Sequence, residues 1–206
     1  MKYFNSLPII LVSIASLFCS TPLLSAEGDD ANQFECPYFS LKTNLISDCV
    51  LAPNGELELP LGKRVSVAAE LTAPWWLAKS GEYCYELVAC GLEGRRWLGE
   101  RAARPAMTGW FACAYCNSGR YDQQNRRMGA QGTFWNAGAG AGYAWHFSRS
   151  LGLELSLGIG YIRSRYEEYE PRENYSVLAY RRTMETSWWG PTRAKVSFVY
   201  RIGRRR

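Results

Sequence analysis

The sequence predicts an all-β protein, an eight-stranded antiparallel transmembrane β-barrel of outer-membrane type. The main observation is that residues 135–147 and 151–161 both alternate strictly between two kinds of side chain. One parity is apolar, with aromatic rings toward its ends, and the other is small or polar. Only a strand, with its period of two residues, sorts such side chains onto separate faces. This arrangement is typical of strands that have lipid outside and a polar lumen inside.

Composition provides the second observation. Aromatic residues make up 14% of the 206 residues, with eight Trp and thirteen Tyr, and amphipathic rings favour membrane interfaces and ligand-binding surfaces. The formal net charge of +5 is mild. It falls to +4 without the first 26 residues, because Lys2 is the only charged residue among them. For an exported chain, this excess does not indicate nucleic-acid binding.

Residues 1–26 are predicted to be a cleaved signal peptide, with Lys2 before an apolar run at 7–18 and a small-residue cleavage site at Ser25-Ala26. The apolar run is too short to cross a bilayer as a helix. Lipid attachment at Cys19 is an alternative that the bulky Phe18 disfavours. After the signal we expect an N-terminal extension at 27–38, a barrel domain at 39–203 and a basic tail at 204–206. The expected location is therefore the cell outer membrane.

Alternation and turn residues divide the barrel domain into eight strands. In chain order they are expected at 39–49, 55–61, 65–75, 83–97, 108–118, 131–147, 151–163 and 191–202. The fourth and fifth are ambiguous, and the fourth places Glu93 and Arg95 on the same parity as Tyr85, so we expect a bulge there. The turns at 61–64 and 147–150 are tight, whereas the segments 119–130 and 164–190 are expected to be long polar loops. Short turns at one rim and longer loops at the other are typical of outer-membrane barrels.

The inner faces of these strands predict a structural ionic network. A barrel of eight strands is only wide enough to be filled by its own side chains, so we expect paired charges and no open pore. The row Gly138, Gly140 and Gly142, facing Gly158 and Gly160, either relieves crowding around these charges or leaves a small ligand cavity. The expected inner charges are Lys42, Asp48, Glu56, Glu58, Glu70, Glu154, Lys195 and Arg201, with Glu93 and Arg95 as further candidates.

The segment 164–189 is the best candidate for a specific interaction. Tyr, Trp and Arg combine contact area with directed polar bonds and dominate binding hot spots. This segment could therefore present a surface to a protein or glycan partner, or it could be a solvated loop whose rings anchor at lipid headgroups. The candidate binding residues are Tyr166, Tyr169, Arg172, Tyr175, Arg181, Trp188 and Trp189.

Catalytic, metal and cofactor sites are not expected. His146 is the single histidine, and the chain has no phosphate-binding glycine loop. His146, Ser148 and Glu154 are similar in type to the triad of outer-membrane lipid deacylases, but His146 and Glu154 are expected to face the lumen rather than lipid. The chain is therefore predicted not to be an enzyme.

The cysteines do not predict a redox site. Cys113 and Cys116 have redox-motif spacing, but in a strand they would point to opposite faces roughly 10 Å apart, beyond the roughly 7 Å that a disulfide tolerates. Pairing between the fourth and fifth strands, or between Cys36 and Cys49, stays open beside a set of free thiols.

Five motifs in order resemble the DUF3575 family, a set of exported Bacteroidetes proteins without an established activity. They are SLKTNL at 40–45, LPLGKRVSV at 59–67, RRWLG at 95–99, GIGY at 158–161 followed by YEEYEP at 166–171, and GPTRAKVS at 190–197. The likeness runs from 39 to 200 and implies a barrel-like outer-membrane protein, with no catalytic residues to transfer. This chain differs in its larger number of cysteines and in ending at Arg206 rather than at an aromatic residue.

Together these observations favour a small non-enzymatic outer-membrane barrel whose surface loops serve interaction or the assembly of envelope and surface structures. One alternative is a soluble periplasmic barrel that binds an apolar ligand, which would need the leucine face of 151–161 turned inward. A further alternative is an outer-membrane lipid-modifying hydrolase. Outer-membrane lipid is the expected partner, and the oligomeric state stays open.

Overall fold

The computed structural model describes residues 37–62, 64–78, 83–99, 106–148, 150–172 and 177–203. The expected signal peptide, most of the N-terminal extension and the basic tail lie outside these residues. The structure confirms the all-β prediction. Its elements are β1 (Pro37–Asn44), α2 (Leu45–Cys49), β2 (Asn54–Pro60), β3 (Val65–Thr72), β4 (Trp75–Ala78), β5 (Tyr83–Trp97), β6 (Gly109–Gln124), β7 (Gly129–His146), β8 (Leu151–Arg172) and β9 (Val177–Gly203).

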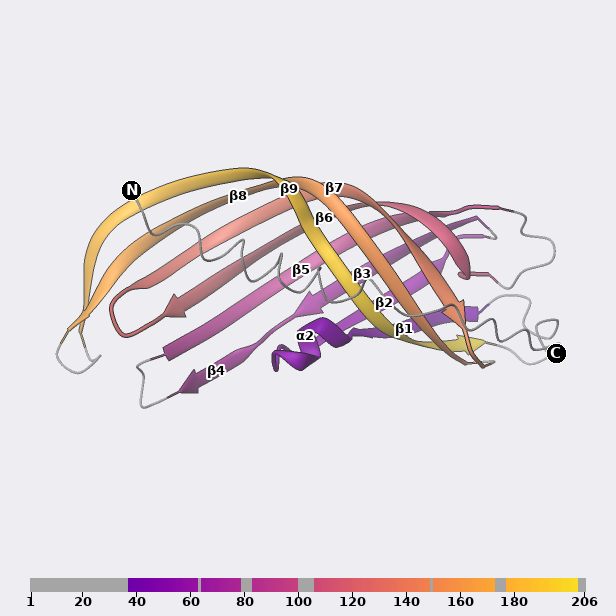
Figure 1. Cartoon of the computed structure of the whole chain (residues 1–206), viewed down its shortest axis with the longest axis horizontal. Helices are drawn as coiled ribbons and strands as arrows, with labels where there is room; N and C mark the ends of the chain where they lie inside the picture. The colour runs from indigo at the N-terminus through magenta and orange to yellow at the C-terminus, as the bar shows by residue number, and fades with distance from the viewer. Residues whose placement is uncertain are drawn as a thin grey trace, which may run out of the picture.

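The strands form one ring-like antiparallel sheet (Figure 1). Each strand pairs with the next along the chain, except that β3 pairs directly with β5, and β9 pairs back with β1. β4 pairs with the first residues of β5, whereas β3 pairs with residues 89–96 of the same strand. β3 and β4 therefore act as one interrupted strand, and Pro74, which lies between them, cannot donate a ladder hydrogen bond.

The first predicted strand is shorter than expected, because the chain leaves the sheet at Asn44. The side-chain oxygen of Asn44 accepts a hydrogen bond from the backbone N–H of Ile46 and caps α2. A helix therefore occupies the residues 45–49 that alternation had assigned to the strand, and Asp48 belongs to that helix.

The two predicted long loops are wrong. Residues 119–124 and 129–130 continue β6 and β7 in unbroken register, and β8 and β9 stay paired as far as Arg172 and Val177. Most residues of these extensions are polar or aromatic on both faces. They therefore lack the alternation of apolar and polar residues by which a strand is recognised in a sequence. The bulge predicted in 83–97 is also wrong, since β5 and β6 pair without a register shift. The shifts lie between β8 and β9 instead, at Gly158/Ile159 and Glu168/Tyr169.

The two faces of the sheet show the inverted polarity that the alternation predicts. On β8, Leu157 and Ile159 are 58% and 69% exposed. Glu154, on the opposite face, is 1% exposed. Other strands repeat this arrangement, so apolar side chains face outward and charged side chains face inward.

The strands differ greatly in length, which makes the two ends of the sheet unlike. We call the end where β1 begins and β9 ends the termini end, and the opposite one, where β1 leads into α2, the α2 end. β1 pairs with β9 only over Ser197–Gly203, so within the described residues the stretch 177–196 has β8 as its only strand partner. In Figure 1, β8 and β9 continue well past α2. At the α2 end the sheet is therefore a curved wall rather than a ring.

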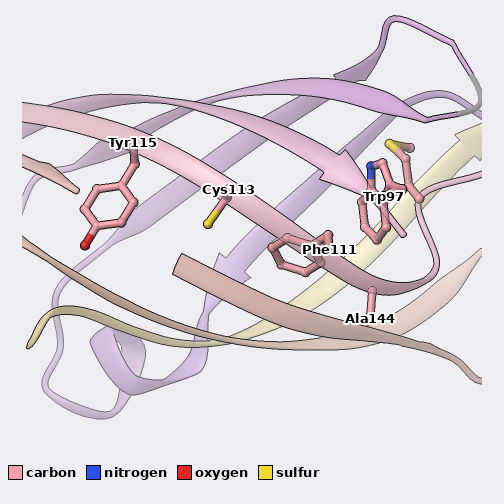
Figure 2. Packing of buried hydrophobic residues seen from close by; sticks show 6 residues of the cluster. Trp97, Phe111, Cys113, Tyr115 and Ala144 are labelled. Carbon is pink, nitrogen blue, oxygen red and sulfur yellow. The ribbon is translucent and has the colours of Figure 1, made fainter. Parts of the chain in front are cut away.

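A compact apolar cluster lies inside the sheet, composed of Trp97, Met107, Phe111, Cys113, Tyr115 and Ala144. Figure 2 shows Phe111, Cys113 and Tyr115 projecting from the same side of β6. The glycine row of β7 makes room for two of these rings. A Cβ at Gly142 would lie 2.5 Å from the Phe111 ring, and one at Gly138 would lie 2.6 Å from the Tyr115 hydroxyl. These glycines thus make room for aromatic rings. The sequence predicted room for the inner charged side chains instead, and at Gly138 and Gly142 no charged group is among the nearest atoms that a Cβ would meet.

Candidate functional site

The inside of the ring holds a continuous network of charged side chains from six strands. Lys42 on β1 lies at its centre, with its Nζ 2.6 Å from a Glu58 oxygen, 2.7 Å from Glu154 and 3.3 Å from Glu56. These carboxylates come from β2 and β8, which flank β1 and β9 on either side. One lysine thus joins strands on two sides of the ring.

Arg95 on β5 reaches the same carboxylates from the opposite wall. Its guanidinium lies 2.8 Å from Glu56, 3.1 Å from Glu58 and 2.9 Å from Glu154. Its Nε also donates a hydrogen bond of 2.7 Å to Glu93 on the same strand. The planar group stacks over the Phe111 ring at 4.8 Å, so the aromatic cluster supports the arginine from one side.

Arg193 and Lys195 on β9 extend the network toward the α2 end. Arg193 lies 2.6 Å from Glu70 and 2.8 Å from Glu93, and its guanidinium stacks on the Tyr115 ring at 4.7 Å. Lys195 pairs with Glu56 and lies 2.8 Å from Glu70. Sequence analysis did not name Arg193, although its parity matches that of Lys195 and could have identified it.

Two predicted members lie apart from this network. Arg201 is 4% exposed and donates to the backbone carbonyl of Met107 at 3.1 Å, with no carboxylate at ion-pair distance among the described residues. Asp48 lies in α2, where its carboxylate accepts hydrogen bonds from Thr43 and Asn54 at 2.7 and 2.8 Å. The structure does bring together Lys42, Glu56, Glu58, Glu70, Glu154 and Lys195, together with Glu93 and Arg95.

Most of the network is buried. Its four bridged cations face five carboxylates, and the separate inner cation Arg201 brings the two charges to equal number. The side chains of Lys42, Glu58 and Glu154 are 1% exposed, and that of Arg95 is fully buried. Such a network contributes little net stability by itself, but each ion in it needs its partners. At this level the ring is filled with protein.

A cavity of about 200 Å³ lies beside the network at the α2 end. Its walls come from β1, α2, β2, β3, β6 and β9 and are mainly polar. Amides, hydroxyls and paired charges dominate its lining, through Asn44, Ser47, Asn54, Thr72, Asn117, Thr192, Arg193, Lys195 and Ser197.

The predicted binding residues of 164–189 do not form one surface. Tyr166 and Tyr169 are 5% and 7% exposed. The Tyr169 hydroxyl donates to Asp122, and burial together with this bond raises the pKa of Tyr169. Arg181 is exposed. The side chain of Arg172 and the whole of Tyr175 lie outside the described residues. Trp188 and Trp189 point to opposite faces of β9, because they are consecutive in a strand.

Two rows of aromatic rings run across the outer face. In one row, nearer the α2 end, Tyr161 contacts Trp135 and Trp189, each with ring centroids 5.4 Å apart. In the other, nearer the termini end, Tyr143 contacts Trp110 at 5.1 Å and Trp145 at 4.8 Å. The sequence shows aromatic rings toward the ends of single strands, but only the register shows that they align across strands.

The similarity to a lipid deacylase triad does not extend to the geometry. The Glu154 carboxylate is bound by Lys42 and Arg95, whereas His146 ends β7 and Ser148 is exposed beyond it. Within the part of the chain that the structure describes, no three His, Cys, Asp or Glu side chains form a group that could hold a metal ion. No helix there is long and apolar enough to cross a membrane.

The described cysteines are free thiols: Cys49, Cys84, Cys90, Cys113 and Cys116. Cys113 is buried and Cys116 is exposed, so the two point to opposite faces as the strand period predicts. The structure therefore contains neither a disulfide between β5 and β6 nor the Cys36–Cys49 pair that the sequence left open, although Cys36 itself lies outside the described residues.

Comparison with known proteins gives one match. A family model described as "Protein of unknown function (DUF3575)" matches residues 14–202. No curated protein and no solved structure matches the chain.

Proposed function

The chain belongs to the DUF3575 family, and we propose that it is a small non-enzymatic outer-membrane β-barrel that presents its β8–β9 hairpin for interaction or for assembly of surface structures. The observation that carries the proposal is the inverted polarity of the sheet. Large apolar side chains are exposed around the outside, while an ionic network is buried inside. Soluble monomers rarely expose apolar surface on this scale.

The spacing of the aromatic rows supports insertion into a bilayer. Trp135 and Trp145 lie ten positions apart on β7, which is about 33 Å along a strand. With the tilt of about 35–45° that is usual in such barrels, this becomes about 23–27 Å of height, close to the roughly 25 Å of an outer-membrane apolar band. The outward residues between them are Ala137, Ala139, Ala141 and Tyr143, none of which is charged.

The pairing supports a closed barrel. β9 pairs with β1, and β3 pairs with β5, so each of β1, β2, β3, β5, β6, β7, β8 and β9 has two strand neighbours. Closure satisfies backbone groups that would otherwise face lipid. Short turns at 61–64 and 147–150 favour a periplasmic termini end, which leaves the long β8–β9 hairpin at the cell surface.

The alternatives have less support. The cavity beside α2 is lined mainly by polar side chains, which does not favour an apolar ligand. The leucines of β8 face outward, opposite to what a soluble carrier needs. A hydrolase would need Glu154 to orient a base, but this carboxylate is bound by two cations.

Membrane insertion is tested by fractionation of cells that express the full chain with its leader. We expect the protein in the outer-membrane fraction, resistant to extraction with urea. Its electrophoretic mobility should shift when the sample is heated in detergent, because a closed barrel stays folded until heated. Recovery in the detergent-free soluble fraction, with no heat-dependent shift, would contradict the proposal.

The role of the hairpin is tested separately. Glu167 pairs with Thr183, so these two residues can be joined by a two-residue turn that removes the end of the hairpin and keeps the aromatic rows. We expect this variant to insert and shift with heat like the parent protein, but to lose the proteins that cross-link to the parent at the cell surface. An unchanged cross-linking pattern would rule out the hairpin as the interaction surface.

A further inference from the structure

Trp188 is not part of the two outer aromatic rows, because it lies on the inner face of β9. It pairs with Ile162 and is 46% exposed. The adjacent Trp189 faces outward, is 73% exposed and contacts Tyr161. The Trp188 indole lies against the inner side of Gly190, where it occupies the space that a Cβ would need. An exposed indole is thus held on the concave side of the sheet.

The indole lies close along β9 to the polar cavity beside α2. Thr192, two residues beyond Gly190, lines the cavity of about 200 Å³, and its hydroxyl bonds the Tyr115 hydroxyl at 2.6 Å. Amide groups of Asn54 and Asn117 line other parts of the wall. The inner face of β9 thus carries an apolar ring a few residues before a cluster of groups that can donate or accept hydrogen bonds.

The charges in the cavity wall are already neutralised. Arg193 and Lys195 each lie within 2.8 Å of Glu70, and Lys195 also pairs with Glu56. A phosphate or carboxylate ligand would find no cation there without a carboxylate beside it, and burying an extra anion would be costly. The electrostatics of the wall therefore favour a neutral polar ligand.

Two buried polar atoms in the wall have no hydrogen-bond partner among the residues that the structure describes. They are the hydroxyl of Ser197, a residue that is 1% exposed, and Nη1 of Arg193, which is 8% exposed. Buried polar groups are nearly always hydrogen-bonded, and leaving one unpaired is unfavourable. A ligand rich in hydroxyl groups would supply one acceptor for the guanidinium and both donors and acceptors for the serine.

We propose that this inner mouth binds a neutral saccharide. One sugar ring would stack its C–H face on Trp188, and further rings of the same chain would bond through their hydroxyls to Thr192, the amide of Asn117, Arg193 and Ser197. The chain of a longer glycan would continue along the concave face of β8 and β9. This site lies on the inner face of β9, where the ring continues as the curved wall of β8 and β9, and it does not depend on the surface role proposed for the hairpin.

The test measures binding of uncharged oligosaccharides to the full mature chain folded in an amine-oxide detergent, since a maltoside detergent would itself present a sugar. The probes are maltohexaose, cellohexaose, mannohexaose and chitohexaose. Inorganic phosphate and an oligogalacturonate represent anions. Isothermal titration and saturation-transfer NMR report binding. We expect at least one neutral hexasaccharide to bind saturably and both anions to fail.

Two neighbouring tryptophans provide a matched comparison. Trp188→Ala should weaken binding by about tenfold or more, because it removes a stacking surface, whereas Trp189→Ala should change it by less than about twofold, because that ring is on the other face. Ser197→Ala, which removes only the unpartnered hydroxyl, should weaken binding by several-fold without altering the heat-dependent shift. The proposal is overturned if no neutral probe binds, if an anion binds instead, or if both tryptophan variants behave alike. Heat-shift behaviour is read independently, so loss of saccharide binding leaves the membrane proposal intact.

Discussion

At the scale of single residues, Arg95 determines how the inside of the ring is held together. Its guanidinium is within 3.1 Å of carboxylates from β2, β5 and β8 and stacks on Phe111 of β6. Lys42 shares three of the same carboxylates. Among the described ion pairs, removing Arg95 would leave the buried carboxylates of Glu58 and Glu154 with Lys42 alone.

We predict that Arg95→Met destabilises the folded protein by about 3–5 kcal/mol, because breaking a buried ionic cluster leaves uncompensated charge. Urea unfolding of protein in lipid vesicles, followed by tryptophan fluorescence, measures this. The control is Arg163→Met, which removes an exposed pair with Glu185 and should leave the unfolding midpoint almost unchanged. Equal midpoints for the two variants would show that the network does not need Arg95.

Parity alone was enough to place most of these charges on one face, because the strand period is insensitive to the details of packing. It could not assign partners, which depend on the register between strands distant in the sequence, such as Arg95 and Glu154. It also failed for Asp48, where the N-cap formed by Asn44 takes the chain out of the sheet. Sequence analysis does not supply the register that identifies which carboxylate each cation meets.

At the scale of elements, the long β6–β7 and β8–β9 hairpins are held together by side chains that sequence analysis treated as loop residues. The Tyr169 ring lies where a Cβ of Gly129 would be, and its hydroxyl donates to Asp122 on β6. One tyrosine therefore links β8 to β6 across β7. Local composition gave no indication of this link, because it exists only once the strands are in register.

We predict that this link weakens at high pH. The pKa of Tyr169 is raised by burial and by its bond to Asp122. Its contribution to stability is therefore fully present below about pH 10, where the unfolded phenol is still protonated, and declines as the pH rises above that value. Protease cleavage of the hairpin should be slower for the parent than for Tyr169→Phe at pH 8, and this difference should shrink by pH 11.

Tyr180→Phe serves as the control, since the exposed Tyr180 hydroxyl bonds the nearby Thr183 on the same strand. A parent and a Tyr169→Phe variant that differ by the same amount at every pH would argue against ionisation of this phenol as the cause.

At the scale of the whole molecule, positions on the outer face differ in where they lie relative to the two aromatic rows. Leu157 pairs with Ala141, midway between the positions of Trp135 and Trp145. Gln131 lies on the same outward parity but beyond Trp135, toward the α2 end. If the aromatic rows mark the two interfaces, the two positions experience different solvents.

We predict that Leu157→Arg destabilises the inserted protein by about 2–4 kcal/mol, whereas Gln131→Arg costs about 0–1 kcal/mol, because the cost of a lipid-facing arginine depends on depth. Reversible unfolding from vesicles measures both. Leu157 is 58% exposed, so in a water-soluble protein its replacement by arginine would be harmless. Equal stability of the two variants would therefore exclude a bilayer around this face.

The sequence predicted the all-β class and the inverted faces because both follow from alternation within single strands. The extent of the strands was underestimated where both faces become polar, as in residues 119–124. The cavity and the inward orientation of Trp188 were not predicted, since they arise from the unequal lengths of β1 and β9 and from the register shift near Gly158.

The balance of buried charge has a consequence for how the molecule interacts with its surroundings. Because the five inner cations named above equal the five carboxylates that they face in number, these inner groups together contribute no net charge. The outward face between the aromatic rows of β7 has no charge either. The exposed charged side chains beyond the aromatic rows, such as Arg163 and Glu185, therefore carry the electrostatic potential that surrounding ions experience, and added salt should act on them while leaving the interior almost unaffected.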